Sequence, residues 1–234
     1  MRWWLILLVI TLSGCVTKLD KTGHTETNVD IKYLAKGEVD RIADTARSEV
    51  ISGLMMIADK LYRRNPKEWR KVGLNSREEA LARLKNRYYK VLPELGGLRE
   101  GQASAMAFNE NYGGDRVGAL MLGLLTMVDA AFEYKEEFYI LDSLNEQKLF
   151  NTARNMEVAV WKLGHDLDSS GNLFLLSNEL DPTNRNISFE REFGRVMGIL
   201  DFMAKIVADR NGRLLSRFTH GVVSTVFFPV SFLK

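Results

Sequence analysis

Apolar residues recur every three to four positions along most of the chain, which is the spacing of one face of an amphipathic α-helix. Three segments show the repeat most clearly and predict long helices over 39–61, 149–163 and 189–207. Asn65-Pro66 is expected to end the first helix, because the residue before a proline disfavours helical geometry. Asn211-Gly212 has the composition of a helix C-terminus and is expected to end the third.

Two further helices are predicted from their start signals. Ser76-Arg77-Glu78-Glu79 has the pattern of a capping box and opens a helix that Pro93 closes. Asp115 is placed to cap a helix running to about Leu141. The first part of that helix, 117–128, is almost wholly apolar, is too short to span a bilayer and predicts a buried central helix. Its glycines, Gly118 and Gly123, permit close approach of a neighbouring helix.

The remaining pattern supports one helical domain. Segment 95–114 is glycine-rich and predicts at most a weak helix in its middle. Strand-like alternation is absent except at the extreme C-terminus. Short connections between long amphipathic helices predict an all-α protein, a single helical bundle formed by residues 29–234.

The N-terminus carries a secretion signal. Arg2 supplies a positive charge, and 3–12 form an apolar run that is too short for a stable membrane-spanning helix and typical of a signal peptide. Leu12-Ser13-Gly14-Cys15 then resembles the lipobox of bacterial lipoproteins. The resemblance implies removal of residues 1–14 by cleavage between Gly14 and Cys15, and acyl chains on the Cys15 sulfur and the new N-terminus. The alternative is a cysteine placed by chance after an ordinary signal peptide or anchor helix.

The segment after the lipidation site predicts a tether. Residues 15–28 are polar and threonine-rich after the cysteine, and a flexible chain of this length has a root-mean-square reach of about 20 Å. Val16 stands where an aspartate would favour retention in the inner membrane, by analogy with enterobacterial lipoproteins. The resemblance therefore implies the outer membrane, with the body facing the periplasm. The periplasmic face of the inner membrane and the cell surface are the alternatives.

The composition excludes wholesale disorder and several kinds of thiol site. Hydrophobic residues make up 46% of the chain and charged residues 26%, which excludes wholesale disorder. Cys15 is the single cysteine, so lipidation leaves no thiol for catalysis, an intrachain disulfide or a thiolate metal site.

Charge is segregated along the chain. Lys60–Lys90 contains eleven basic and three acidic residues, whereas Asp129–Glu146 contains six acidic and one basic. Basic residues interspersed with aromatic ones also occur in nucleic-acid-binding proteins, but a secreted body meets no nucleic acid. Anionic phospholipid head groups or wall polymers are the expected anionic surfaces. The alternatives are that the basic segment packs beside the acidic one or is a solvated face. The candidate contacts are Arg63, Arg64, Lys67, Arg70 and Lys71.

Patterns of known catalytic sites are absent. The chain has no G-x-S-x-G nucleophile motif, no P-loop and no H-E-x-x-H zinc helix. A di-iron bundle requires Glu-x-x-His, whereas Lys162 precedes His165 and Arg217 precedes His220. Segment 113–118 resembles a dinucleotide-binding turn only loosely and predicts a loop followed by a helix start. We therefore expect a non-enzymatic protein without a cofactor.

One short segment resembles a metal site. Residues 166–173 follow the first eight positions of an EF-hand calcium loop, and the resemblance implies that Asp166, Asp168, Ser170 and Asn172 supply the ligands. The twelfth position, normally a bidentate glutamate, is Ser177. The alternative is a polar loop that ends a helix.

Together these patterns predict a lipid-anchored envelope protein that binds another envelope component, first of all a protein. The alternative is a carrier or sensor of an apolar ligand such as a lipid, held in a pocket lined by Met121, Met127, Met197 and Phe202. An enzyme with an unfamiliar site is a third hypothesis. The apolar C-terminus, 218–233, is expected either to fold back onto the bundle or to present an apolar patch to a membrane or partner.

Overall fold

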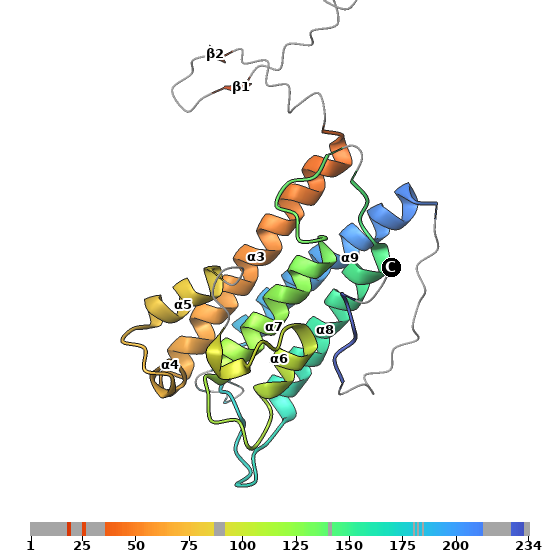
Figure 1. Cartoon of the computed structure of the whole chain (residues 1–234). Helices are drawn as coiled ribbons and strands as arrows, with labels where there is room; N and C mark the ends of the chain where they lie inside the picture. The colour runs from red at the N-terminus through yellow and green to blue at the C-terminus, as the bar shows by residue number, and fades with distance from the viewer. Residues whose placement is uncertain are drawn as a thin grey trace, which may run out of the picture.

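The computed structural model describes residues 36–86, 92–139, 142–179, 181, 183, 185–212 and 226–231, together with two short paired strands, β1 (Lys18–Leu19) and β2 (Thr25–Glu26) (Figure 1). The predicted signal peptide, Cys15 and most of the predicted tether lie outside these residues. The body is all-α, as the sequence predicts. Its helices are α3 (Glu38–Arg64), α4 (Lys67–Lys71), α5 (Arg77–Lys85), the 3₁₀ helix η2 (Pro93–Leu95), α6 (Glu100–Met106), α7 (Arg116–Ala131), α8 (Glu146–His165) and α9 (Ser188–Arg210).

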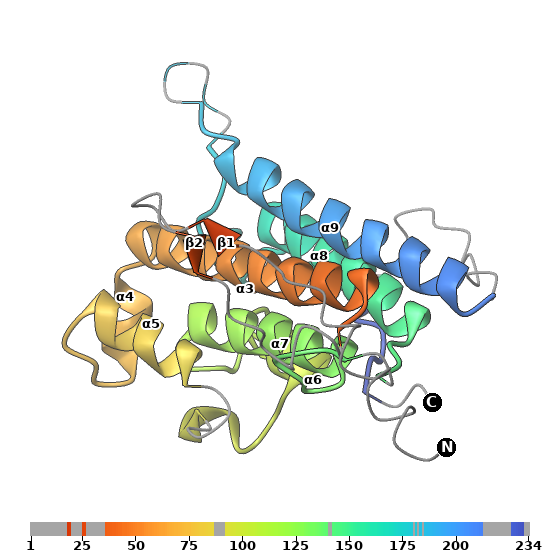
Figure 2. The same cartoon turned by 90° about the horizontal axis from the view of Figure 1, so that it is seen from above.

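Four long helices form the bundle. α3 contacts α7, α7 contacts α8, α8 contacts α9, and α9 returns to α3, so the four close a ring around the core. α6 packs on the outer side of α7, and Figure 2 shows α6 and α9 on opposite sides of the molecule. The apolar stripe predicted for α9 is buried along its whole length. Its members are Phe189, Phe193, Val196, Leu200, Met203 and Val207.

α7 is the central helix, as its apolar sequence predicts. Every residue from Val117 to Ala131 is buried, because α3, α6 and α8 cover it on several sides. Asp115 caps it, accepting a hydrogen bond from the Gly118 backbone N–H at 2.8 Å. Among the described helices, none combines the length and the apolar character needed to cross a bilayer.

The contact between α6 and α7 depends on Gly123. A Cβ atom at this position would lie 2.1 Å from the Ser104 hydroxyl and 2.4 Å from the Glu100 carbonyl oxygen. Hydrogen bonds hold the two helices at this separation: Ser104 Oγ donates to the Leu120 carbonyl, and the Glu100 N–H donates to Thr126 Oγ1. The expected close approach at Gly123 is confirmed.

Three helices differ from the sequence prediction. α5 ends at Lys85, with Asn86 as its C-cap, and does not continue to Pro93. α7 ends at Ala131, ten residues before Leu141, because the chain turns sharply through Glu133 and Tyr134, both with positive φ. The turn returns Phe138 to the core, where its ring lies 6.0 Å from that of Phe132. The glycine-rich segment 95–114 also contains a full α-helix, α6, stabilised by its packing on α7.

The C-terminal residues 226–231 fold back onto the bundle. They lie beside α8 and α6 (Figure 1), and Val230 is fully buried. Asn155 of α8 pairs with both backbone groups of Phe228, accepting from its N–H at 2.6 Å and donating to its carbonyl at 2.9 Å. Asn151 donates to the Pro229 carbonyl. The fold-back interpretation of the C-terminus is confirmed for these residues.

Candidate functional site

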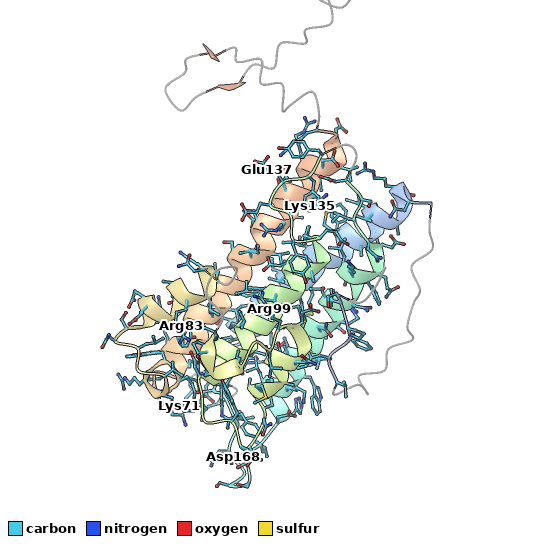
Figure 3. All side chains as sticks on the ribbon, viewed as in Figure 1. Lys71, Arg83, Arg99, Lys135, Glu137 and Asp168 are labelled. Atoms are coloured by element: carbon cyan, nitrogen blue, oxygen red, sulfur yellow. The ribbon has the colours of Figure 1, made fainter. Side chains whose placement is uncertain are left out.

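A surface groove of about 670 Å³ lies where α4 and the end of α3 face the loop that follows α8. We name it the basic groove. Figure 3 shows Lys71 and Asp168 at this end of the body. Arg63, the fifth cation singled out from the sequence, pairs instead with Asp59 outside the groove. The groove is lined by Arg64, Asn65, Pro66, Lys67, Glu68, Arg70, Lys71, Glu110, Arg116, Asp168, Asn172, Leu173, Phe174 and Leu176.

Asn65 fixes the two walls of the groove relative to each other. It ends α3, and its buried side chain pairs with both backbone groups of Leu176, donating to the carbonyl and accepting from the N–H, each at 2.8 Å. The same amide also donates to the Leu61 carbonyl at the end of α3. The Asn65 side chain thereby joins the end of α3 to a distant loop, and both its amide nitrogen and its oxygen have hydrogen-bond partners.

Glu68 forms the floor of the groove. Its fully buried carboxylate accepts hydrogen bonds from Lys71 Nζ, at 2.8 Å to each oxygen, and from the Arg116 backbone N–H at 3.0 Å. Burial of a carboxylate is costly unless it is paired, and these contacts satisfy the charge. Glu68 therefore connects α4 to the start of α7 and neutralises Lys71.

Arg116 brings a further cation to the groove. Its guanidinium donates to the carbonyls of Ala107 and Asn109 at 2.9 and 2.8 Å, and stacks at 4.8 Å from the centre of the Phe174 ring. Carbonyl acceptors orient the guanidinium without cancelling its charge, which persists at every physiological pH. Arg116 therefore keeps the groove positive.

Lys67 and Arg70 supply the accessible charge. Both are exposed, and neither takes part in an ion pair within the described part of the chain. The Arg70 guanidinium lies 4.8 Å from the centre of the Trp69 ring, a cation–π contact that leaves its N–H donors available. Arg64, by contrast, is paired with Glu179. Two of the five predicted contacts thus take part in no described ion pair. Three acids also line the groove, Glu68, Glu110 and Asp168, so its cations outnumber its acids five to three.

The basic and acidic segments do not neutralise each other. Basic residues of 60–90 pair with Asp59, Glu68, Glu78, Glu94 and Glu179, and no ion pair among the described residues joins them to 129–146. The acidic segment finds other cations: Asp129 pairs with Arg47, Glu133 with Lys148 and Glu137 with Lys36. Figure 3 places Glu137 and Lys135 at the opposite end of the body from Lys71.

The chain matches no protein-family model, no curated protein and no solved structure. The interpretation of the basic groove therefore depends on its own geometry and charge.

A buried acid lies beneath the groove. The Asp115 carboxylate is 1% exposed and accepts hydrogen bonds from Tyr62 Oη at 2.7 Å and from the Gly118 N–H at 2.8 Å. Burial raises the pKa of Asp115 to about 6, although both hydrogen bonds act in the opposite direction, and the nearby Glu68 raises it further. Burial and the neighbouring Asp115 also raise the pKa of Tyr62 well above its usual range.

Asp115 should make stability depend on pH. Its folded pKa of about 6 lies above its ordinary value of 3.8, so between these values the folded state binds the proton more tightly than the unfolded chain. Its contribution to the free energy of unfolding is therefore greatest below pH 4 and falls by about 3 kcal/mol as pH rises through 6. Asp115→Asn keeps an acceptor for Gly118 and removes this dependence.

We expect denaturant titrations at pH 4, 5, 6 and 7 to show the stability difference between wild type and Asp115→Asn shifting in favour of the variant as pH rises. Every other titratable group is present in both chains, so the difference between their stabilities isolates the titration of Asp115. A difference that stays constant across these four pH values would contradict the assignment.

The two aspartates proposed as calcium ligands already have partners in the loop and on α8. The Asp168 carboxylate accepts hydrogen bonds from the backbone N–H groups of residues 170 and 172, and Asp166 pairs with Lys162. Gly171 has a φ of 78°, as a tight polar turn requires. The described residues contain no group of three or more His, Cys, Asp or Glu side chains placed to hold a metal ion. The calcium site stays a prediction from the sequence.

The residues proposed to line an apolar pocket do not gather around one of the described grooves. Met121 and Met127 are fully buried in the core, whereas Phe202 on α9 is 59% exposed. Met197 is partly buried against the core.

Sequence reasoning missed Asn65, Glu68 and Arg116 as groove residues. Of these three residues, Glu68 alone stands out in the sequence, because it is an acidic residue among basic ones.

Proposed function

We propose that the protein is a lipid-anchored, non-enzymatic component of the bacterial envelope whose helical body binds an acidic protein partner through the basic groove. The lipobox-like sequence ending at Cys15 supports the anchor. The proposal rests on Lys67 and Arg70, two exposed cations of the groove that take part in no described ion pair, and on Arg116 beside them.

The composition of the groove favours a protein over a simple polyanion. Two guanidinium groups stack on aromatic rings, Arg70 on Trp69 and Arg116 on Phe174, and Leu176 is 48% exposed in the same groove. Arginine and aromatic side chains beside exposed apolar surface are characteristic of protein interfaces. A partner with carboxylates next to an apolar patch would complement all three features.

The position of the groove favours a partner other than the anchoring membrane. The tether precedes α3, which has 27 residues and is therefore about 40 Å long, and the basic groove lies at the far end of that helix. The acidic turn lies at the near end, where Glu137 pairs with Lys36 and the Phe138 N–H donates to Asp44. The tether is attached at this end, so the basic groove lies a full helix length away from the side of the body that is joined to the anchor.

Reversal of the accessible groove charge tests the proposal. A photo-crosslinking amino acid at Leu176 of the full, lipidated chain should give an adduct with an acidic envelope protein. Lys67→Glu together with Arg70→Glu should reduce that adduct at least tenfold, because like charges would then face the partner. Raised salt should weaken the adduct in the wild type.

The matched control is Lys85→Glu with Lys205→Glu, which makes the same change in net charge at two exposed lysines outside the groove. This control should leave the adduct at the wild-type level. Cys15→Ser tests the anchor separately: it should leave an unprocessed precursor that gives less adduct, because anchoring raises the effective concentration. An adduct unaffected by the groove reversal would overturn the site, and mature-sized, membrane-associated Cys15→Ser protein would overturn the anchor.

A further inference from the structure

A second groove, of about 640 Å³, lies between α6 and the folded-back C-terminal residues 226–231. We name it the tail groove. It is distinct from the basic groove and shares no lining residue with it. The tail groove is lined by Gly97, Arg99, Glu100, Gly101, Gln102, Ala105, Phe108, Lys162, Val226, Phe227, Phe228, Pro229 and Ser231.

The tail forms one wall of this groove and is held rigidly. Asn155 pairs with both backbone groups of Phe228, and the Glu100 carboxylate accepts a hydrogen bond from the Ser231 N–H at 3.2 Å. Phe227 packs closely on α6, since a Cβ at Gly101 would lie 2.7 Å from the Phe227 Cβ. The tail therefore runs beside α6 (Figure 1), and these hydrogen bonds and this close contact hold it there.

The lining of the tail groove is mainly apolar and includes two cations, Arg99 and Lys162. Ala105 of α6 and Phe108 of the following turn line the groove together with four apolar tail residues, 226–229, of which Val226 is 70% exposed. Arg99 takes part in no ion pair within the described residues, and Figure 3 shows it at the start of α6. Lys162 Nζ lies 5.3 Å from the centre of the Phe108 ring and pairs with Asp166.

The groove lining holds one acid, which keeps its negative charge, against the two cations Arg99 and Lys162. Glu100 lines the groove, but its carboxylate is bound to the tail backbone at Ser231. A volume between 300 and 1,000 Å³, mainly apolar walls and a few polar groups are the usual features of a small-molecule site. The cations select a ligand with a negative group, and the apolar walls select a hydrocarbon body.

We propose that the tail groove binds a single-chain anionic amphiphile, a hydrocarbon chain of the fatty-acyl type that ends in a carboxylate. The chain lies between α6 and the tail, against Phe108 and Phe227, and the carboxylate lies at Arg99. The site is complete only when the tail is folded back, because the tail supplies one of its two walls. This binding is independent of the protein partner proposed for the basic groove.

The test is calorimetric titration of dodecanoate, below its micelle concentration, into the chain from Val16 to Lys234, which retains every described residue. We expect saturable binding of one dodecanoate per chain. Dodecanol, with the same chain and no charge, should bind at least fivefold more weakly, and acetate, with the charge alone, should not bind measurably. These two probes separate the contributions of the hydrocarbon chain and the carboxylate.

Two variants locate the site. Ala105→Trp places a large side chain in the groove at an exposed position and should weaken dodecanoate binding at least tenfold, whereas Ala82→Trp at an exposed position on α5 should leave it unchanged. Arg99→Gln should weaken dodecanoate binding several-fold and leave dodecanol binding unchanged. Arg99 is outside the buried core, so this variant remains informative if the tryptophan variant fails to fold.

Absence of saturable binding to the wild-type chain would overturn the proposal. Equal affinity of Ala105→Trp and Ala82→Trp would show that the amphiphile binds elsewhere and would overturn the assigned site. Equal affinity of the wild type for dodecanoate and dodecanol would overturn the anionic selectivity.

Discussion

Deletion of Pro229–Lys234 is expected to lower the free energy of unfolding by about 3–5 kcal/mol. Burial of an aliphatic side chain such as Val230 is worth about 1.5–3 kcal/mol. The deletion also removes the Pro229 carbonyl to which the buried Asn151 amide donates, and an unsatisfied buried polar group costs about 1–3 kcal/mol. The change is measured by urea unfolding, followed by far-ultraviolet circular dichroism.

Two single substitutions control for the tail deletion. Val230→Ala should be clearly destabilising, because Val230 is fully buried, whereas Val226→Ala should change the free energy of unfolding by less than about 0.5 kcal/mol, because Val226 is 70% exposed. A deletion variant as stable as the wild type would show that the fold-back of the tail contributes nothing to stability.

Gly123→Leu is expected to destabilise the protein by about 4 kcal/mol or more. Its Cβ alone would lie 2.1 Å from Ser104 Oγ and 2.4 Å from the Glu100 carbonyl, so α6 and α7 must separate to accommodate any side chain. Separation would break the Ser104 and Thr126 hydrogen bonds between the two helices and open the buried face of α7.

Gly164→Leu is the matched control. Gly164 is also helical, but it is exposed on α8 and an added Cβ would meet no atom within 4 Å. Leucine favours a helix over glycine by roughly 0.5–1 kcal/mol, so this variant should be as stable as the wild type or slightly more stable. Comparison of the two by denaturant unfolding separates steric overlap from helix propensity, and similar effects of both substitutions would refute the close-packing argument.

The long helices and most of their ends follow from the sequence, because the signals are local, whereas the short helices α4 and α6 do not. The apolar stripe ending at Leu61 and the Asn65-Pro66 stop predict α3, and Ser76 caps α5 by accepting from the Glu79 N–H. The end of α7 is different. The turn at Glu133 returns Phe138 to the core, and no residue near Ala131 indicates in the sequence that Phe138 packs there.

The candidate site was only partly predictable for the same reason. A run of basic residues identified the cations of the groove, but composition cannot show which of them are neutralised. Arg64 meets Glu179, which is 115 residues away in sequence, and Glu68 meets Arg116 across the start of α7. Lys67, in the same run, is left exposed and outside any described ion pair.

Residue spacing and local signals in the sequence predict the helical class, the order of the long helices and the buried character of α7, and they carry the resemblance of the N-terminus to a lipoprotein signal. These properties depend on residue spacing along the chain, which is the same before and after folding. The packed helices were needed to show which cations form ion pairs, how Asn65 joins α3 to Leu176, and where the tail lies on Asn155. Those outcomes depend on distances of a few ångströms between residues far apart in sequence, and such distances exist only once the helices have packed.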